Sequence, residues 1–262
     1  MEGSYETLQV SRKDQVVRIT LDRPDVHNAF NATMLAELNR AISWLKQEKS
    51  ARVVVLTGKG KSFCAGADIQ WMKEIVRYSY EQNLRESLQL AEVLENLYKL
   101  PRPTIAMVNG AAIGGGNGFV SACDIAVAAE EAIFGLSEVK IGLVPAAISP
   151  YVIRRIGESR AREYFLTGQR IPAAKAREIG LVNDVVRREK LEEKVAELVN
   201  LLLSSGPEAL ARCKELIFQV PRMSLEEAKD YTARMIADLR VSEEGQEGMA
   251  AFLEKRKPRW SK

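Results

Sequence analysis

The chain has 262 residues, of which 46% are hydrophobic and 28% charged, and its formal net charge at pH 7 is +3. This length and composition allow a substantial buried core, which excludes an intrinsically disordered protein. The net charge is small and the basic residues are interleaved with acidic ones, so no nucleic-acid partner is expected. No apolar run is long enough to span a bilayer, and we therefore expect no membrane association.

The N-terminal residues and the rare residue types narrow the class further. The start, MEGSYETLQV, has no basic-then-apolar signal pattern, so a cytoplasmic location is expected. The cysteines Cys64, Cys123 and Cys213 are odd in number and far apart, which argues against disulfides and against a structural zinc site. His27 is the sole histidine, so one subunit cannot assemble a histidine-rich metal site or a Ser-His-Asp triad. We expect no metal.

The first hundred residues alternate between strand and helix patterns. Short β-type runs at 8–10 and 16–21 predict a hairpin. A helix is predicted after Asn31, which can cap it, because apolar residues recur there at steps of three and four. The run ARVVVLTGKG at 51–60 is typical of a strand buried on both faces, and a loop follows at 62–68.

The remaining elements predict an α/β fold with a mainly parallel sheet. A helix at 80–97 stops at two prolines, strands are expected at 104–108, 125–128 and 132–134, and a helix forms within 110–122. Repeated strand, helix and strand imply right-handed crossovers between parallel strands. From about Ser159 the composition favours helices, so the last third of the chain is predicted to be helical.

The stretch AAIGGGNGFVSACD, from Ala111 to Asp124, contains three consecutive glycines that let backbone approach another group closely. A dinucleotide-binding fingerprint would follow the first strand, whereas these glycines lie in mid-chain, and no P-loop lysine is present. Two interpretations remain open on this stretch alone: an oxyanion hole at a helix N-terminus, or close packing of helices by small residues.

A second segment, KSFCAGADIQWM at 61–72, decides between them. Together with GAAIGGGNGFVSACDIAVAAEEAIFGLSEVKIGLVP it resembles the crotonase superfamily of enoyl-CoA hydratases and isomerases. The resemblance extends from LDRPDVHNAF near the start to FLEKRKPRW at the end. It implies a spiral core of β-β-α turns over residues 1–200 and a C-terminal helical oligomerisation region over 201–262. A homotrimer or homohexamer is expected.

The resemblance also implies a site for an acyl-CoA thioester. The backbone amides of Ala67 and Gly115 would hold the thioester oxygen and stabilise an enolate, with each donor contributing roughly 3 kcal/mol in measured oxyanion holes. Coenzyme A belongs to the substrate, so no separate cofactor is expected. The residues expected to contact substrate or CoA are Ala65, Asp68, Ile69, Gln70, His27, Phe252 and Lys255.

The acid/base group is expected to be Glu138, in FGLSEVKIG. Hydratases of the family commonly carry a second glutamate at the position that Gly118 occupies here. Without it, a glutamate pair cannot activate water, and a double-bond isomerase that relays one proton with Glu138 gains weight. A carboxylate in such a site is expected to have a raised pKa.

The segment KIGLVPAAISPYVIRRIG, residues 140–157, resembles bacterial methylglutaconyl-CoA hydratases of leucine breakdown, which often lack the first glutamate. Hydration of a 2-enoyl-CoA is therefore favoured over isomerisation, with thioester hydrolysis third. A non-enzymatic scaffold or RNA-binding member is disfavoured by the intact loop and Glu138. Arg154 and Arg155 could bind a substrate carboxylate, but a helix-surface pair in salt bridges is the stronger interpretation.

Overall fold

The computed structural model describes residues 4–261, which separate into two compact units. The first unit runs to Leu100 and continues over Thr104–Val195. The second comprises Pro101–Pro103 and the chain from Ala196 onward. The division predicted at residue 200 lies within a helix, α7 (Leu191–Leu203), that links the two units along the chain.

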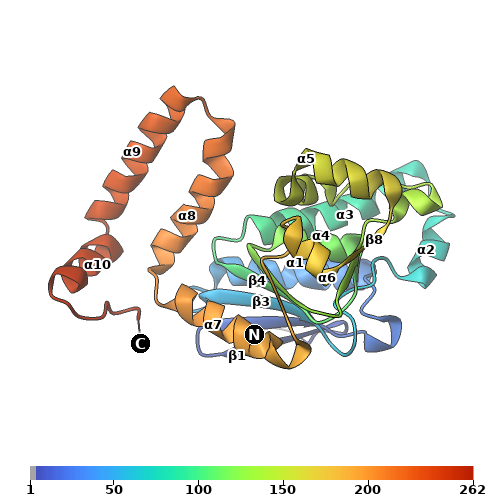
Figure 1. Ribbon diagram of the computed structural model, residues 1–262, viewed down its shortest axis with the longest axis horizontal. Helices are drawn as coiled ribbons and strands as arrows, with labels where there is room; N and C mark the ends of the chain where they lie inside the picture. The colour runs from blue at the N-terminus through green and yellow to red at the C-terminus, as the bar shows by residue number, and fades with distance from the viewer. Residues whose placement is uncertain (1–3, 262) are drawn as a thin grey trace. The chain divides into compact units, whose positions relative to one another are not determined.

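A six-stranded sheet forms the centre of the first unit, with the strand order β1-β2-β3-β4-β6-β9 (Figure 1). β1 and β2 are the predicted hairpin and pair antiparallel, with Leu8 opposite Leu21. All later neighbours pair in parallel, as the strand and helix repeats predict. The strands are β1 (Leu8–Lys13), β2 (Val16–Leu21), β3 (Val53–Gly58), β4 (Thr104–Val108), β6 (Ile125–Ala129) and β9 (Asp184–Val186).

A second sheet consists of three short strands, the first of which leads directly into the glycine run. β5 (Ala112–Ile113) pairs in parallel with β7 (Ile133–Gly135), and β8 (Arg170–Pro172) pairs antiparallel with β7. The prediction of a helical last third of the chain is confirmed except at β8 and β9, which are strands. Each has three residues, which is too short for an alternating pattern to be visible in the sequence.

Four helices of the first unit pack in succession, α1 on α3, α3 on α4 and α4 on α5, and Figure 1 shows them on one side of β3 and β4. The Asn31 side chain caps α1 as predicted, accepting from the Met34 N–H at 3.0 Å. The helical segments are η1 (Pro24–Val26), α1 (Ala32–Gln47), α2 (Ile69–Ile75), α3 (Tyr80–Tyr98), α4 (Gly115–Ala122), η2 (Glu138–Ile141), α5 (Ser149–Thr167), α6 (Ala173–Glu178) and η3 (Arg188–Lys190).

Arg155 on α5 fastens this helix to the end of the sheet. Its Nε donates to the Leu181 carbonyl at 2.7 Å, and its Nη1 donates to the Cys123 carbonyl at 2.7 Å. The interpretation of Arg155 as half of a surface salt-bridge pair is therefore wrong, because its guanidinium satisfies backbone carbonyls. Arg154 is exposed and lies over the Tyr98 ring, 5.8 Å from its centre.

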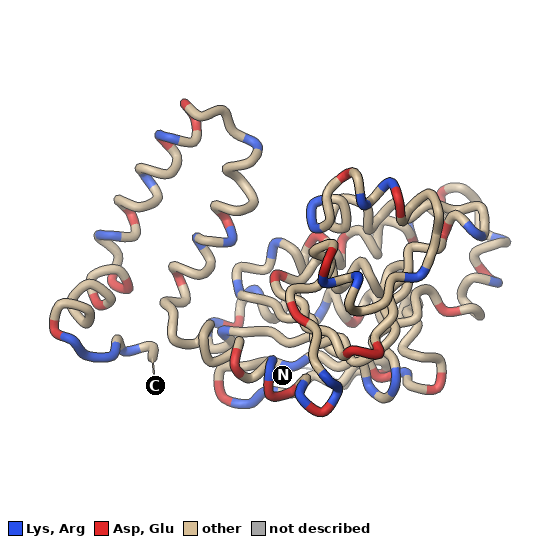
Figure 2. Tube along the Cα trace, viewed as in Figure 1, with Lys and Arg blue, Asp and Glu red and all other residues tan. Residues whose placement is uncertain are grey.

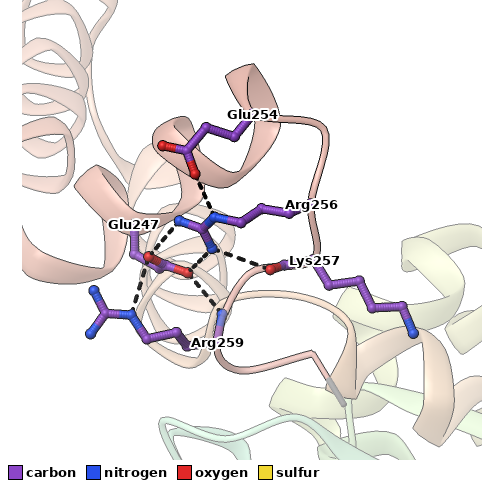
Figure 3. A network of polar contacts seen from close by, with 5 residues as sticks. All are labelled: Glu247, Glu254, Arg256, Lys257 and Arg259. Atoms are coloured by element: carbon purple, nitrogen blue, oxygen red, sulfur yellow. Dashed lines mark hydrogen bonds and ion pairs between the residues drawn. The ribbon is translucent and has the colours of Figure 1, made fainter.

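The second unit contains the helices α8 (Pro207–Gln219), η4 (Val220–Arg222), α9 (Leu225–Val241) and α10 (Glu243–Leu253). Its C-terminal tail carries a run of basic residues, whereas both charge signs are interleaved elsewhere (Figure 2). Figure 3 shows that Arg256 folds back onto α10, donating to Glu247 at 2.7 Å, while the Arg259 N–H donates to the same carboxylate at 2.9 Å. Arg256, with help from Arg259, lowers the pKa of Glu247 to about 2.

None of the helices in the described chain combines the length and the apolar character that crossing a bilayer requires.

Candidate active site

The loop at 62–68 is held by backbone hydrogen bonds to the segment that leads into α4. Cys64 and Ala112 form a parallel bridge, in which the Cys64 N–H donates to the Ala111 carbonyl at 3.0 Å. The Ile113 N–H donates back to the Cys64 carbonyl at 3.0 Å. The two segments predicted to form the oxyanion hole therefore run side by side.

A second bridge, between Phe30 and Ala67, sets the direction of the Ala67 N–H. The Phe30 N–H donates to the Gly66 carbonyl at 2.8 Å, and the Asp68 N–H donates to the Phe30 carbonyl at 2.9 Å. In such a ladder the N–H of the intervening residue points away from the partner strand. Accordingly, the Ala67 N–H meets no acceptor among residues 4–261.

Glycine is required beside Ala67 and at the start of α4 by backbone conformation. Gly66 has a φ of +96°, and Gly114, which precedes α4, has a φ of +53°. Residues other than glycine rarely adopt this left-handed backbone conformation. Gly114 turns the chain so that the Gly115 N–H is the first of the helix, where it has no intrahelical acceptor.

The start of α4 packs against the loop that carries Ala67, because Phe30 bridges Ala67 and its ring lies against Gly115. No hydrogen bond from Gly115 is present in the part of the chain that the structure describes. The helix dipole adds partial positive charge at this end. Two unpaired backbone donors beside a helix N-terminus are suited to negative charge that develops on a carbonyl oxygen.

Close packing, the other interpretation of the glycine run, is present on different faces of α4. A Cβ on Gly115 would lie 2.5 Å from Cε1 of the Phe30 ring, and one on Gly116 would lie 2.3 Å from the Cys64 carbonyl oxygen. Because Phe30 both bridges Ala67 and packs on Gly115, it fixes the two donors relative to each other. The small residues thus allow the packing that positions the amides.

Glu138 lies beside Gly114, the residue that precedes the Gly115 donor. The Gly114 N–H donates to the Gly135 carbonyl at 2.9 Å, and η2 begins with Glu138 three residues after Gly135. Glu138 Oε1 is 3.1 Å from the position that a Cβ on Gly114 would occupy. Its other oxygen, Oε2, is buried and has no hydrogen-bond partner. Burial raises the pKa of Glu138, as expected for a carboxyl group that exchanges a proton.

The position of the second family glutamate is closed by Ile148. A Cβ on Gly118 would lie 2.3 Å from Ile148 Cγ2 and 3.4 Å from Leu94 Cδ2. Ile148 is 2% exposed and comes from the AAISPY segment before α5. An apolar wall therefore stands where a paired carboxylate would be, and Glu138 has no carboxylate partner from this helix.

The residues expected to contact substrate or CoA are divided between structural and exposed positions. Asp68 is 6% exposed, caps α2 by accepting from the Gln70 N–H at 2.7 Å, and pairs with Arg23 at 2.7 Å. Burial alone would raise the pKa of Asp68, but these partners, led by Arg23, lower it. Asp68 therefore holds the loop that carries Ala67, and Ile69 is 72% exposed at the start of α2.

The remaining expected contact residues lie near the loop or in the second unit. The exposed His27 shares a 3.0 Å hydrogen bond between its Nδ1 and the Ser62 hydroxyl, and its carbonyl accepts from the Ala65 N–H at 3.0 Å. Gln70 is exposed on α2. Phe252 is 83% exposed, and Lys255 has a φ of +55° beside Arg256. Their contact with CoA stays a prediction.

The sequence did not single out Phe30, Glu86, Gln89 or Asn117. Phe30 contacts Trp71 and Phe119 edge to face, each with ring centres 5.8 Å apart. Buried atoms without a hydrogen-bond partner include Trp71 Nε1, Glu86 Oε2, Gln89 Oε1 and Asn117 Nδ2. One signal was available in the sequence, because Glu86 lies on the same helix stripe as Leu90 and Leu94.

Other chemistries find little support at this site. Burial raises the pKa of Cys64 to about 12, so its thiol is a poor nucleophile. Within residues 4–261, no cluster of three or more His, Cys, Asp or Glu side chains could hold a metal ion. The arrangement that remains is one carboxyl group beside two backbone donors, which defines a site for proton transfer next to a polarised carbonyl.

Comparison with known proteins gives this arrangement a family. Residues 11–262 match the family model described as enoyl-CoA hydratase/isomerase, and the chain belongs to that family. An enoyl-CoA hydratase structure from Shewanella pealeana is 41% identical, with a TM-score of 0.94, and the match covers 97% of this chain and 96% of the other. The fold is accordingly the α/β crotonase fold with a C-terminal helical region, and the protein is an enzyme of this family.

Two further relatives show the range of the match. The solved structure of Pseudomonas aeruginosa AtuE is 36% identical with a TM-score of 0.95, covering 98% of this chain and 100% of the other. Enoyl-CoA hydratase ACTT6 of Alternaria alternata is 36% identical over 253 residues, which is 95% of this chain and 81% of its own length.

The close approach of Ile148 to Gly118 predicts a strong energetic coupling between the two positions. Gly118→Ala should lower the free energy of unfolding by about 1–3 kcal/mol, because the added methyl overpacks against Ile148. In an Ile148→Ala background the same change should be neutral or stabilising by up to about 1 kcal/mol, since alanine favours helix. Denaturant unfolding of the four proteins measures this cycle, and additive effects would contradict the packing described.

Glu138 also predicts a pH-dependent stability. Its pKa is raised in the folded state, so the folded chain loses stability as pH rises from the ordinary glutamate value of 4.5 through the raised value. Glu138→Gln carries no charge and avoids this loss. The free energy of unfolding of the variant should therefore rise relative to that of the wild type between pH 4 and neutral pH. Urea unfolding at fixed protein concentration measures this difference. A stability difference that is constant over this range would show that the carboxyl is not destabilised by burial.

Proposed function

We propose that the enzyme adds water reversibly to the double bond of a 2-enoyl-CoA thioester, with Glu138 as the single acid/base group. The observation that carries the proposal is the buried, unpartnered Oε2 of Glu138 beside Gly114, next to the unpaired amides of Ala67 and Gly115. A buried carboxylate without a partner costs free energy in the empty site. A substrate or water that donates a hydrogen bond to it removes that cost.

In the proposed reaction, the Glu138 carboxylate takes one proton from water while the water oxygen bonds to C3 of the acyl chain. The electron pair of the double bond moves onto the thioester oxygen, where the N–H groups of Ala67 and Gly115 stabilise the enolate. Glu138 then delivers the same proton to C2, so that atoms and charge balance. The reverse sequence removes water from a 3-hydroxyacyl-CoA.

Double-bond isomerisation is the second candidate function, and the apolar wall of Ile148 over Gly118 favours it. Glu138 would remove a C2 proton from a 3-enoyl-CoA and return it to C4, with the same amides holding the enolate oxygen. No nucleophilic water has to be held in that case. We rank hydration first because the relatives from Shewanella pealeana and Alternaria alternata are named enoyl-CoA hydratases.

The acyl chain is proposed to be branched, as in methylglutaconyl-CoA, on the resemblance of the AAISPYVIRR segment. Arg155 is not available for a substrate carboxylate, since it donates to the Leu181 and Cys123 carbonyls. The buried donors around α4 that lack a partner are Trp71 Nε1 and Asn117 Nδ2. A role in leucine breakdown or fatty-acid metabolism, and a cytoplasmic location, stay predictions.

A homotrimer or homohexamer is proposed for the assembly. The second unit exposes large apolar side chains along its helices, including Ile217 on α8 at 72%, Leu225 on α9 at 92% and Val241 at 78%. No residue of α8 is fully buried within the chain. Contiguous exposed apolar surface of this kind favours contact with another subunit.

The test incubates the protein with crotonyl-, 3-methylglutaconyl- and 3-hexenoyl-CoA in water enriched in heavy oxygen and follows the products by mass spectrometry. Hydration incorporates the label as a hydroxyl group, and Glu138→Gln should lower kcat by about 10²- to 10⁴-fold because the proton carrier is lost. Glu130→Gln, at an exposed glutamate of the same region, is the matched control.

Three outcomes separate the candidates. Label in the product that depends on Glu138 supports hydration, and migration of the double bond without label supports isomerisation. Unchanged turnover in Glu138→Gln, or no turnover of any of the three thioesters, would overturn the assignment of Glu138.

A further inference from the structure

Glu86 lies on the face of α3 that borders the candidate active site. Glu86, Leu90 and Leu94 are spaced four residues apart and form one stripe of the helix. Leu90 Cδ2 is 3.6 Å from the position of a Cβ on Gly115, and Leu94 Cδ2 is 3.4 Å from that on Gly118. The two helices therefore run alongside each other in the same direction.

This alignment places Glu86 next to the space in front of α4. α4 begins at Gly115, level with Leu90, whereas α3 extends further in the N-terminal direction. Glu86 is one helical turn, about 5.4 Å, before Leu90. The N–H groups at the start of α4 point into this space, and the thioester is proposed to bind there. A group one turn beyond the first residue of α4 can contact the acyl part of the substrate.

The polar atoms on this part of α3 are buried without partners. Glu86 Oε2 and Gln89 Oε1 are both inaccessible to solvent and make no hydrogen bond, although neither residue is fully buried as a whole. Leaving a buried acceptor unpaired costs free energy, and the cost is larger for a charged group. Two such acceptors within one helical turn indicate that a ligand supplies the donor.

Trp71 on α2 carries another buried polar atom, Nε1, without a hydrogen-bond partner. Its ring packs on Phe30, which in turn packs on Gly115. Phe30 and Leu90 thus both border the first residue of α4, with Glu86 one turn from Leu90.

We propose that the Glu86 carboxylate accepts a hydrogen bond from an O–H group on the acyl chain of the substrate. The inference rests on the proposed acyl-thioester site and specifies its substrate class as acyl chains that carry a polar end. A hydroxyl group supplies this donor directly, and a carboxyl group supplies it in its protonated form. A plain alkyl chain leaves the Glu86 oxygen unpaired.

The test compares saturated thioesters, which cannot be hydrated, so that binding is measured separately from reaction. Calorimetry with the full chain would measure hexanoyl-CoA, 6-hydroxyhexanoyl-CoA and adipyl-CoA. The wild type should bind at least one of the two polar thioesters about 10- to 100-fold more tightly than hexanoyl-CoA, because a charged acceptor gains its donor. Tight binding of adipyl-CoA identifies a carboxyl group as the source, and tight binding of the hydroxyl compound alone identifies a hydroxyl group.

Variants on α3 decide whether Glu86 is responsible. Glu86→Leu should abolish the preference for the polar thioester and tighten hexanoyl-CoA, and Glu86→Gln, which keeps an acceptor, should retain a weaker preference. Glu92→Leu, at an exposed position of the same helix, is the matched control and should behave as the wild type. A structural role alone would weaken all three thioesters equally.

Two results would overturn the inference: equal affinity of the wild type for all three thioesters, or an unchanged preference in Glu86→Leu. A large loss of kcat in Glu86→Gln with every enoyl-CoA would also overturn it, because Glu86 would then take part in the proton transfer. If the polar preference is found but no hydration product forms, the proposed reaction fails and the inference stands. If no thioester binds, both fail.

Discussion

Two backbone N–H groups that the fold leaves without acceptors are the feature on which the active site depends. Ala67 sits in a bridge whose hydrogen bonds are made by its neighbours, and Gly115 is the first residue of a helix. Each N–H is unpaired for a different geometrical reason, and Phe30 packs against both segments. The proposed oxyanion hole is therefore built from backbone groups, whose donors would need no reorientation when charge develops on a bound oxygen.

The single carboxyl group follows from the same packing. Glu138 is carried beside Gly114 by the pairing of β5 with β7, so its position depends on backbone hydrogen bonds as well. Ile148 fills the space next to Gly118 that a second carboxylate would need. In the proposed reaction, one buried acid/base group therefore acts with the two amides, and it relays one proton at a time.

Much of the fold could be predicted from the sequence because its elements are long and strongly patterned. The strand at 104–108, the helix at 80–97 and the Asn31 cap agree closely with the structure. The short strands β8 and β9 and the helix α2 could not be predicted, since they are formed by tertiary pairing more than by local periodicity. Arg155 was misinterpreted because a sequence does not show that a guanidinium faces unpaired carbonyls.

The prediction of the site was also uneven. Ala67, Gly115 and Glu138 were predicted from the family motifs, and their roles stay a prediction; in the structure Glu138 lies beside Gly114, and Phe30 contacts both Ala67 and Gly115. The closing of the Gly118 position by Ile148 depends on a contact between residues thirty positions apart, which no local pattern reveals. Likewise, the sequence does not show that polar atoms of Glu86 and Gln89 are buried without hydrogen-bond partners.

The central claim is that the Ala67 and Gly115 amides bind the thioester oxygen, and infrared difference spectroscopy tests it most directly. A saturated acyl-CoA labelled with carbon-13 at the thioester carbonyl would be bound to Glu138→Gln, which retains both amides but lacks the acid/base group. We predict that the carbonyl stretching frequency falls below its value in water, because two preorganised donors polarise the bond. A frequency equal to that in water would show that the oxygen does not lie between these amides and would contradict the account.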